Sequence, residues 1–108
     1  MIGINKGPIA LNLETQLIRA TIGVQPRALG KGAIVAVVVV NTLNNMDSTN
    51  NATEIMVGNA TGQPYQMLPG QESPLIYASD LDDVYARVRT GVVEVDVTVI
   101  IYKEKRVI

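Results

Sequence analysis

The run Ala33–Val40 constrains the fold of this 108-residue chain more than any other feature, because every residue in it is apolar. It reads AIVAVVVV, and such β-branched residues favour strands. A strand of a sandwich usually has one face toward water. Three explanations of the second apolar face are open. The strand is covered on both sides, its outer face packs on another subunit, or small side chains are tolerated on an exposed face.

Apolar residues alternate with a period of two along much of the chain, and clusters of Gly, Pro and Asn interrupt the runs. Helical spacing is sustained nowhere. We therefore expect one all-β domain over residues 1–108, a single β-sandwich of about seven or eight strands with a jelly-roll or immunoglobulin-like arrangement. Residues 1–8 are expected to form a short N-terminal arm, and residues 103–108 a charged C-terminal tail.

Two local patterns predict where the chain turns in its first and middle parts. Apolar residues occupy odd positions up to Leu13 and even positions from Ile18, which predicts a bulge or short turn within Glu14–Gln16. Pro69-Gly70 predicts a turn between two short strands.

A hairpin is predicted near the C-terminus, where Thr90-Gly91 separates two strand-like segments, 85–89 and 92–102. A two-residue loop places Arg87 opposite Glu94, a pair of opposite charges that suits cross-strand neighbours. The odd-numbered residues of the second strand then form a core stripe, namely Val93, Val95, Val97, Val99 and Ile101.

Composition excludes most catalytic chemistry, because the chain has no His and no Cys. It therefore has no imidazole base, thiolate nucleophile, disulfide or Cys/His zinc site. We expect a protein that is not an enzyme and has no cofactor. A net charge of −1 with scattered basic residues argues against a nucleic-acid partner. The longest apolar run is far shorter than the roughly 20 residues that span a bilayer, and no signal-peptide pattern is present, so we expect synthesis in the cytoplasm and no membrane partner.

Two further residue groups deserve a chemical interpretation. Asp80, Asp82 and Asp83 could bind a hard cation or, with a basic residue in a pocket, support an enzyme. The calcium-loop pattern is absent, and Asp80 capping one helical or 3₁₀ turn needs fewer assumptions. The four tyrosines are the chain's only aromatic rings. Two or three of them on one concave surface would favour the alternative function, a carbohydrate-binding or host-adhesion module, whereas rings at the sheet rim would not.

The second half of the chain resembles a known family. Val57–Ser73 reads VGNATGQPYQMLPGQES, Asp80–Val88 reads DLDDVYARV, and a Val-rich last strand follows. This order is similar to that of small β-sandwich accessory proteins of tailed bacteriophage virions, such as head decoration proteins. The resemblance implies a structural role on the capsid surface of a virion, assembly as a homo-oligomer, often a trimer, and the major capsid protein as partner. It carries over no catalytic or binding residue.

Residues in three segments are candidates for contact with another subunit or with a capsid lattice. The apolar run, the Asn-rich loop 41–51 and the charged tail supply them. They are Val35, Val37 and Val39, then Leu43 and Met46, and finally Lys103, Lys105 and Arg106.

Overall fold

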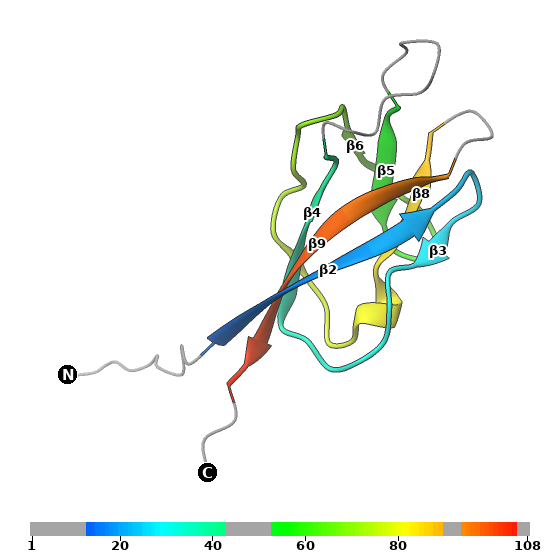
Figure 1. Cartoon of the computed structure of the whole chain (residues 1–108). Coiled ribbons are helices and arrows are strands. Elements are labelled where there is room, and N and C mark those ends of the chain that lie inside the picture. The colour runs from blue at the N-terminus through cyan, green and yellow to red at the C-terminus, as the bar shows by residue number, and fades with distance from the viewer. Residues whose placement is uncertain (1–12, 43–52, 90–93, 106–108) are drawn as a thin grey trace.

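The computed structural model describes residues 13–42, 53–89 and 94–105, which form two four-stranded antiparallel sheets packed against each other (Figure 1). The first sheet has the order β2-β9-β4-β7, and the second has the order β3-β8-β5-β6. The strands are β2 (Leu13–Ile22), β3 (Arg27–Ala28), β4 (Ala36–Val40), β5 (Ile55–Gly58), β6 (Tyr65–Met67), β7 (Ile76–Tyr77), β8 (Tyr85–Val88) and β9 (Val95–Glu104), with a 3₁₀ turn, η2 (Leu81–Asp83), before β8. The expected all-β sandwich of about eight strands is confirmed.

The core lies between the sheets and is made of aliphatic side chains. Alternate residues of the central strands point inward and are buried, as a period of two requires. They include Val37, Val39, Val97, Val99 and Ile101 from the first sheet, and Ile55, Val57, Ala86 and Val88 from the second. The core stripe expected in β9 is thus confirmed from Val95 to Ile101, and Val93 lies outside the described residues.

The predicted hairpin between β8 and β9 is wrong. β9 pairs with β2 and β4, whereas β8 pairs with β3 and β5, so these two consecutive strands belong to different sheets. Arg87 lies opposite Met56, and Glu94 forms an ion pair of 3.8 Å with Arg27. Alternation alone allowed the wrong register, because two apolar stripes that face each other across a core look the same in sequence as two neighbours in one sheet.

The bulge expected within Glu14–Gln16 is also wrong. β2 pairs with β9 without interruption from Leu13 to Ile22. Leu13 is on the outer face of the sheet, whereas Ile18 and Ile22 face the core. The change from odd to even apolar positions therefore reflects the two faces of one regular strand, not a bulge. The beginning of β2 and the end of β9 project beyond the rest of the sandwich, and residues 13–17 are exposed (Figure 1).

The turn at Pro69-Gly70 is confirmed. The backbone N–H of Gln71 donates to the carbonyl of Leu68 over 3.0 Å, which closes a four-residue turn. Gly70 has a φ of 87°, a conformation typical of the third residue of a type II turn and strained for other residues. The Pro-Gly pair therefore determines how the chain leaves β6.

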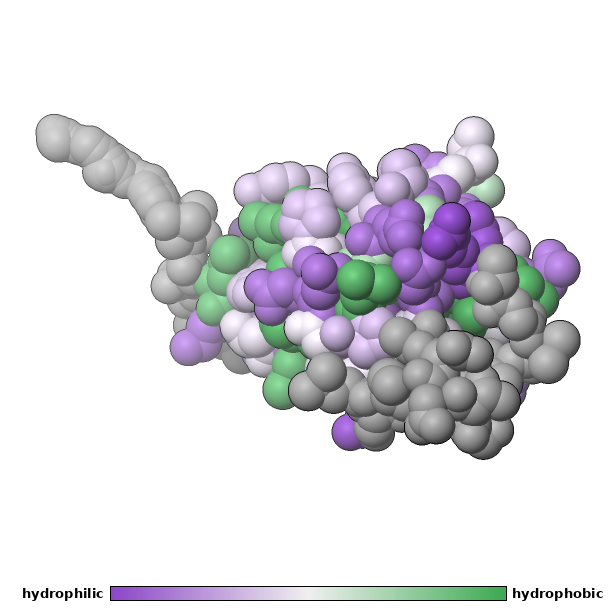
Figure 2. Space-filling view, turned by 90° about the horizontal axis from the view of Figure 1, so that it is seen from above, coloured by the Kyte–Doolittle hydropathy of each residue, from purple (hydrophilic) through white to green (hydrophobic). Residues whose placement is uncertain are grey.

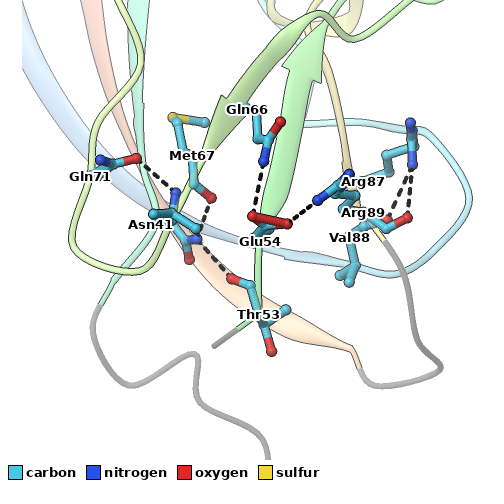
Figure 3. Close-up of polar contacts among 10 residues, drawn as sticks. Asn41, Thr53, Glu54, Gln66, Met67, Gln71, Arg87, Val88 and Arg89 are labelled. Atoms are coloured by element: carbon cyan, nitrogen blue, oxygen red, sulfur yellow. Dashed lines mark hydrogen bonds and ion pairs between the residues drawn. The ribbon is translucent and has the colours of Figure 1, made fainter. Parts of the chain in front are cut away.

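A buried amide connects this turn to both sheets (Figure 3). Asn41 follows β4 and is 0% exposed. Its Nδ2 donates to the carbonyls of Thr53 and Met67, each over 3.0 Å, and its backbone N–H donates to the carbonyl of Gln71 over 2.9 Å. Asn41 thus fixes the end of β4 against the start of β5 and the end of β6.

Candidate functional site

The outer face of the first sheet carries a row of aliphatic side chains across three strands. Leu17 of β2 lies opposite Ile100 of β9, and Ile100 lies opposite Val38 of β4. We call these three residues the apolar row. Leu17 is 66% exposed, and the other two are half-buried. No described element covers this face, which belongs to the sheet lying in front in Figure 1.

The residues beside the apolar row extend it on one side and bound it on the other. Tyr102 of β9 lies between Thr15 and Ala36 in the neighbouring row, and its ring is half-buried. On the opposite side, Arg19 and Thr98 are exposed or half-exposed polar residues. The apolar surface is therefore centred on β9. Polar residues bound it on β2 and β9, whereas the half-buried Val40 of β4, opposite Thr98, is apolar.

The face seen in Figure 2 is of mixed character. Seen from above, the apolar surface is divided into small patches between hydrophilic residues (Figure 2). The outer face of the second sheet carries Glu54, whose carboxylate accepts from Arg89 Nη1 over 2.6 Å and from Gln66 Nε2 over 2.9 Å (Figure 3). The hydrogen bonds from Arg89 and Gln66 lower the pKa of Glu54. This carboxylate is ionised and bound in a network, so it is unsuited to take up a proton at neutral pH.

Only some of the residues predicted to contact a partner lie on the surface of the molecule. Val37 and Val39 are both 0% exposed and belong to the core, so their prediction as contacts is wrong. Because both faces of the run are apolar, its sequence could not tell which face points inward. Val35 is 37% exposed at a bend before β4.

The remaining candidates lie at or beyond the ends of the described segments. Lys103 is half-buried within β9, opposite Glu14, and Lys105 is exposed just after the strand. The charged tail therefore begins later than expected, because Lys103 and Glu104 are still part of β9. Leu43, Met46 and Arg106 lie outside the described residues, as does the expected arm of residues 1–8.

The three aspartates form a capped turn, as the simpler interpretation predicted. The Asp80 carboxylate accepts from the backbone N–H of Asp82 over 3.0 Å and of Gly32 over 3.1 Å. The hydrogen bond from the Asp82 backbone, followed by that from Gly32, lowers the pKa of Asp80, whereas the side-chain contact with Asp80 raises the pKa of Asp82. Within residues 13–42, 53–89 and 94–105, no group of three or more acidic, His or Cys residues is arranged to hold a metal ion.

Two tyrosines share one concave surface, which is the arrangement that favours a carbohydrate-binding module. Tyr65 of β6 and Tyr77 of β7 both line a groove of about 450 Å³. Tyr77 is 75% exposed and Tyr65 is 43% exposed. Asn59 and Asp83 are polar residues in the same lining. Each tyrosine lies in the last strand of its sheet, so the groove runs between the open edges of the sandwich.

Comparison with protein-family models, with curated proteins and with solved structures finds no match to this chain. In the described segments, no helix has the length and apolar character needed to cross a membrane.

Proposed function

We propose that this protein is a non-enzymatic structural protein of a bacteriophage virion, which assembles as a homo-oligomer and docks on the capsid surface. The apolar row of Leu17, Val38 and Ile100 is the observation that carries the assembly. The likeness of Val57–Ser73 and Asp80–Val88 to head decoration proteins supports the virion, the trimeric order and the major capsid protein as partner.

A second copy of the chain is the occupant that best suits the apolar row. The row contains no charged side chain, and a net charge of −1 gives little repulsion between copies. Full burial of an exposed leucine stabilises by about 1.5–3 kcal/mol, and a symmetric contact gains this from each copy. A small domain with an aliphatic core has a modest stability of its own, so such a contact contributes a large fraction of the total.

The projecting part of β2 and β9 supports a further contact outside the sandwich. Leu13 and Glu14 of β2 pair with Glu104 and Lys103 of β9 beyond the part of β9 that pairs with β4, and the strand leads to the exposed Lys105. Two strands without a third are marginally stable in water, so this ribbon gains stability when a partner covers it. We assign it to the contact with the capsid lattice, where many small contacts are distributed over a wide area.

The assembly is tested by size-exclusion chromatography with light scattering on the wild type and two matched variants. Leu17→Lys places a charge in the apolar row on an exposed strand, and we expect it to convert the oligomer to a monomer. Leu68→Lys makes the same change at a leucine that is 44% exposed and follows the end of β6, and we expect it to leave the oligomer intact. Equal elution masses for all three proteins would contradict the role of the row.

The virion assignment is tested separately by the genes beside this one and by mass spectrometry of purified particles. We expect a major capsid, portal or head-protease gene in the neighbourhood, and this chain in the particles. A gene neighbourhood without virion genes, together with particles that lack the chain, would refute the assignment and leave the assembly experiment unaffected.

A further inference from the structure

The groove between the open sheet edges has the composition of a small-molecule site. Its volume of about 450 Å³ lies within the roughly 300–1,000 Å³ typical of ligand sites. Apolar lining from Ile76 and Ala78 is combined with two tyrosine rings and a few polar residues. Such sites typically have apolar and aromatic walls with a small number of polar groups that orient the ligand.

The two tyrosines are the large aromatic side chains at this edge of the sandwich, and both are exposed. The other apolar side chains of β6 and β7 pack in or against the core, as Met67 and Ile76 do, and the exposed Gln66 is hydrogen-bonded to Glu54. Tyr77 leaves three quarters of its surface in water, and Tyr65 leaves more than two fifths. Exposed rings on a concave surface suit a ligand with a flat apolar face and a polar rim, and pyranose sugars have both.

Two polar groups in the groove are available to the hydroxyls of such a ligand. Asn59 uses its side-chain oxygen to accept from the backbone N–H groups of Thr61 and Gly62, over 2.8 and 3.1 Å. These bonds orient the amide and leave Nδ2 without an acceptor among the described residues. The Asp83 carboxylate likewise accepts no hydrogen bond from the described part of the chain. A sugar hydroxyl both donates and accepts, so it can satisfy a donor such as Nδ2 and an acceptor such as this carboxylate.

A second concave surface adjoins the groove and lengthens the site. It measures about 600 Å³ and shares Pro64 and Tyr65 with the groove, and Gln71 and Glu72 lie in its lining. Tyr65 therefore stands between two hollows, which suits a chain of sugar units better than one unit. Neither lining includes Lys or Arg, and each includes one carboxylate, so the charge disfavours acidic sugars.

The wall of the groove is held by close packing at a glycine. A side-chain carbon at Gly58 would contact Gly62 O and would lie 2.6 Å from Pro64 Cδ. Only glycine allows the 59–64 turn to approach this closely, and the turn carries Asn59 and Pro64 into the lining. The site is thus pre-formed, which reduces the entropy cost of binding.

We propose that the groove formed by Tyr65, Tyr77, Asn59 and Asp83 binds uncharged oligosaccharides by stacking and hydrogen bonding. This function is additional to the proposed assembly and uses different residues. Tyr77 lies opposite Ala36 on the outer face of the first sheet, in the row beside the apolar row. None of Leu17, Val38 and Ile100 lines the groove. A structural protein with such a site could attach its particle to a glycan.

The test is isothermal titration calorimetry of the full chain against a panel of neutral hexasaccharides (maltohexaose, cellohexaose, xylohexaose and N-acetylchitohexaose), with oligogalacturonate as the acidic comparison. We expect at least one neutral hexasaccharide to bind, more tightly than its monosaccharide, and oligogalacturonate not to bind. Loss of one stacking ring weakens binding severalfold, to about tenfold, so Tyr77→Ala and Tyr65→Ala should each reduce affinity by that factor.

Two control variants separate stacking from general effects. Tyr77→Phe keeps the ring and removes the hydroxyl, and it should retain most of the affinity. Leu75→Ala removes a side chain 45% exposed beside β7 that is in neither lining, and it should bind as the wild type does. Absence of binding to every neutral hexasaccharide at millimolar concentration, binding of oligogalacturonate alone, or binding unaffected by Tyr77→Ala would overturn the proposal.

Discussion

Replacement of Asn41 by Ala should destabilise the fold more than any exposed polar substitution, because its amide is completely buried. Nδ2 donates to the carbonyls of Thr53 and Met67, residues that are 8% and 3% exposed. Asn41→Ala leaves both carbonyls without this donor. A buried polar group that loses its partner costs about 1–3 kcal/mol, so the two together give about 2–6 kcal/mol. This is a large part of the roughly 5–15 kcal/mol that stabilises a typical domain.

Urea denaturation followed by circular dichroism measures this loss, since the chain has no Trp for fluorescence. Asn41→Asp keeps the shape and replaces the donor by an acceptor, so it should be at least as harmful as Asn41→Ala. The matched control is Asn59→Ala, which also removes two hydrogen bonds but from an exposed side chain where water can replace them. A loss for Asn41→Ala no greater than for Asn59→Ala would refute the reasoning.

Two further predictions concern acid stability and close packing. The pKa of Glu54 is lowered in the folded state, so the ionised carboxylate stabilises the fold above the ordinary value of 4.5, and this stabilisation disappears as the pH falls through the lower folded value. In thermal melts, Glu54→Gln should therefore lose less stability in acid than the wild type does. Parallel curves of melting temperature against pH for the two proteins would contradict this. Gly58→Ala should lower the free energy of unfolding, measured by urea denaturation, by about 1–3 kcal/mol, because the new carbon meets the backbone of the 62–64 turn. Gly62→Ala adds a carbon with no atom within 4 Å, so it should leave the free energy of unfolding nearly unchanged. Equal losses in the two variants would show that the close approach at Gly58 is unimportant.

The fold class and the core stripe could be predicted because they depend on local alternation. Val97, Val99 and Ile101 point inward whichever strand lies beside them. The Pro69-Gly70 turn and the Asp80 cap were also predictable, since each needs only a residue type at a particular backbone position.

Strand partners were not predictable in the same way. The last strand pairs with β2 and β4, which precede it by more than fifty residues, and nothing within the strand specifies them. Arg87 and Glu94 looked like cross-strand neighbours because they have opposite charges. Opposite charges in any two strands that are consecutive in the chain would have given the same indication. Long-range pairing depends on how the whole core is filled, and local patterns do not contain that information.

The candidate sites show the same limit. The sequence identified an apolar strand with two apolar faces, but it named Val37 and Val39 as contacts when Val38 is on the outer face. Leu17 was missed because the partners of its strand were unknown. The available signal was that Leu17 precedes Ile18 in the strand, so the two side chains point to opposite faces of the sheet. The sequence could say only that two or three tyrosines on one concave surface would indicate a sugar site. It could not show that Tyr65 and Tyr77 share such a surface, because β6 and β7 are edge strands of different sheets and their side chains come together only in the folded structure.

The proposed assembly of this protein through the apolar row can be measured by native mass spectrometry of the wild type at micromolar concentration. We expect a defined species at a whole-number multiple of the 11.6 kDa chain mass, and we expect Leu17→Lys to abolish it. A mass of 11.6 kDa at every concentration measured would contradict it.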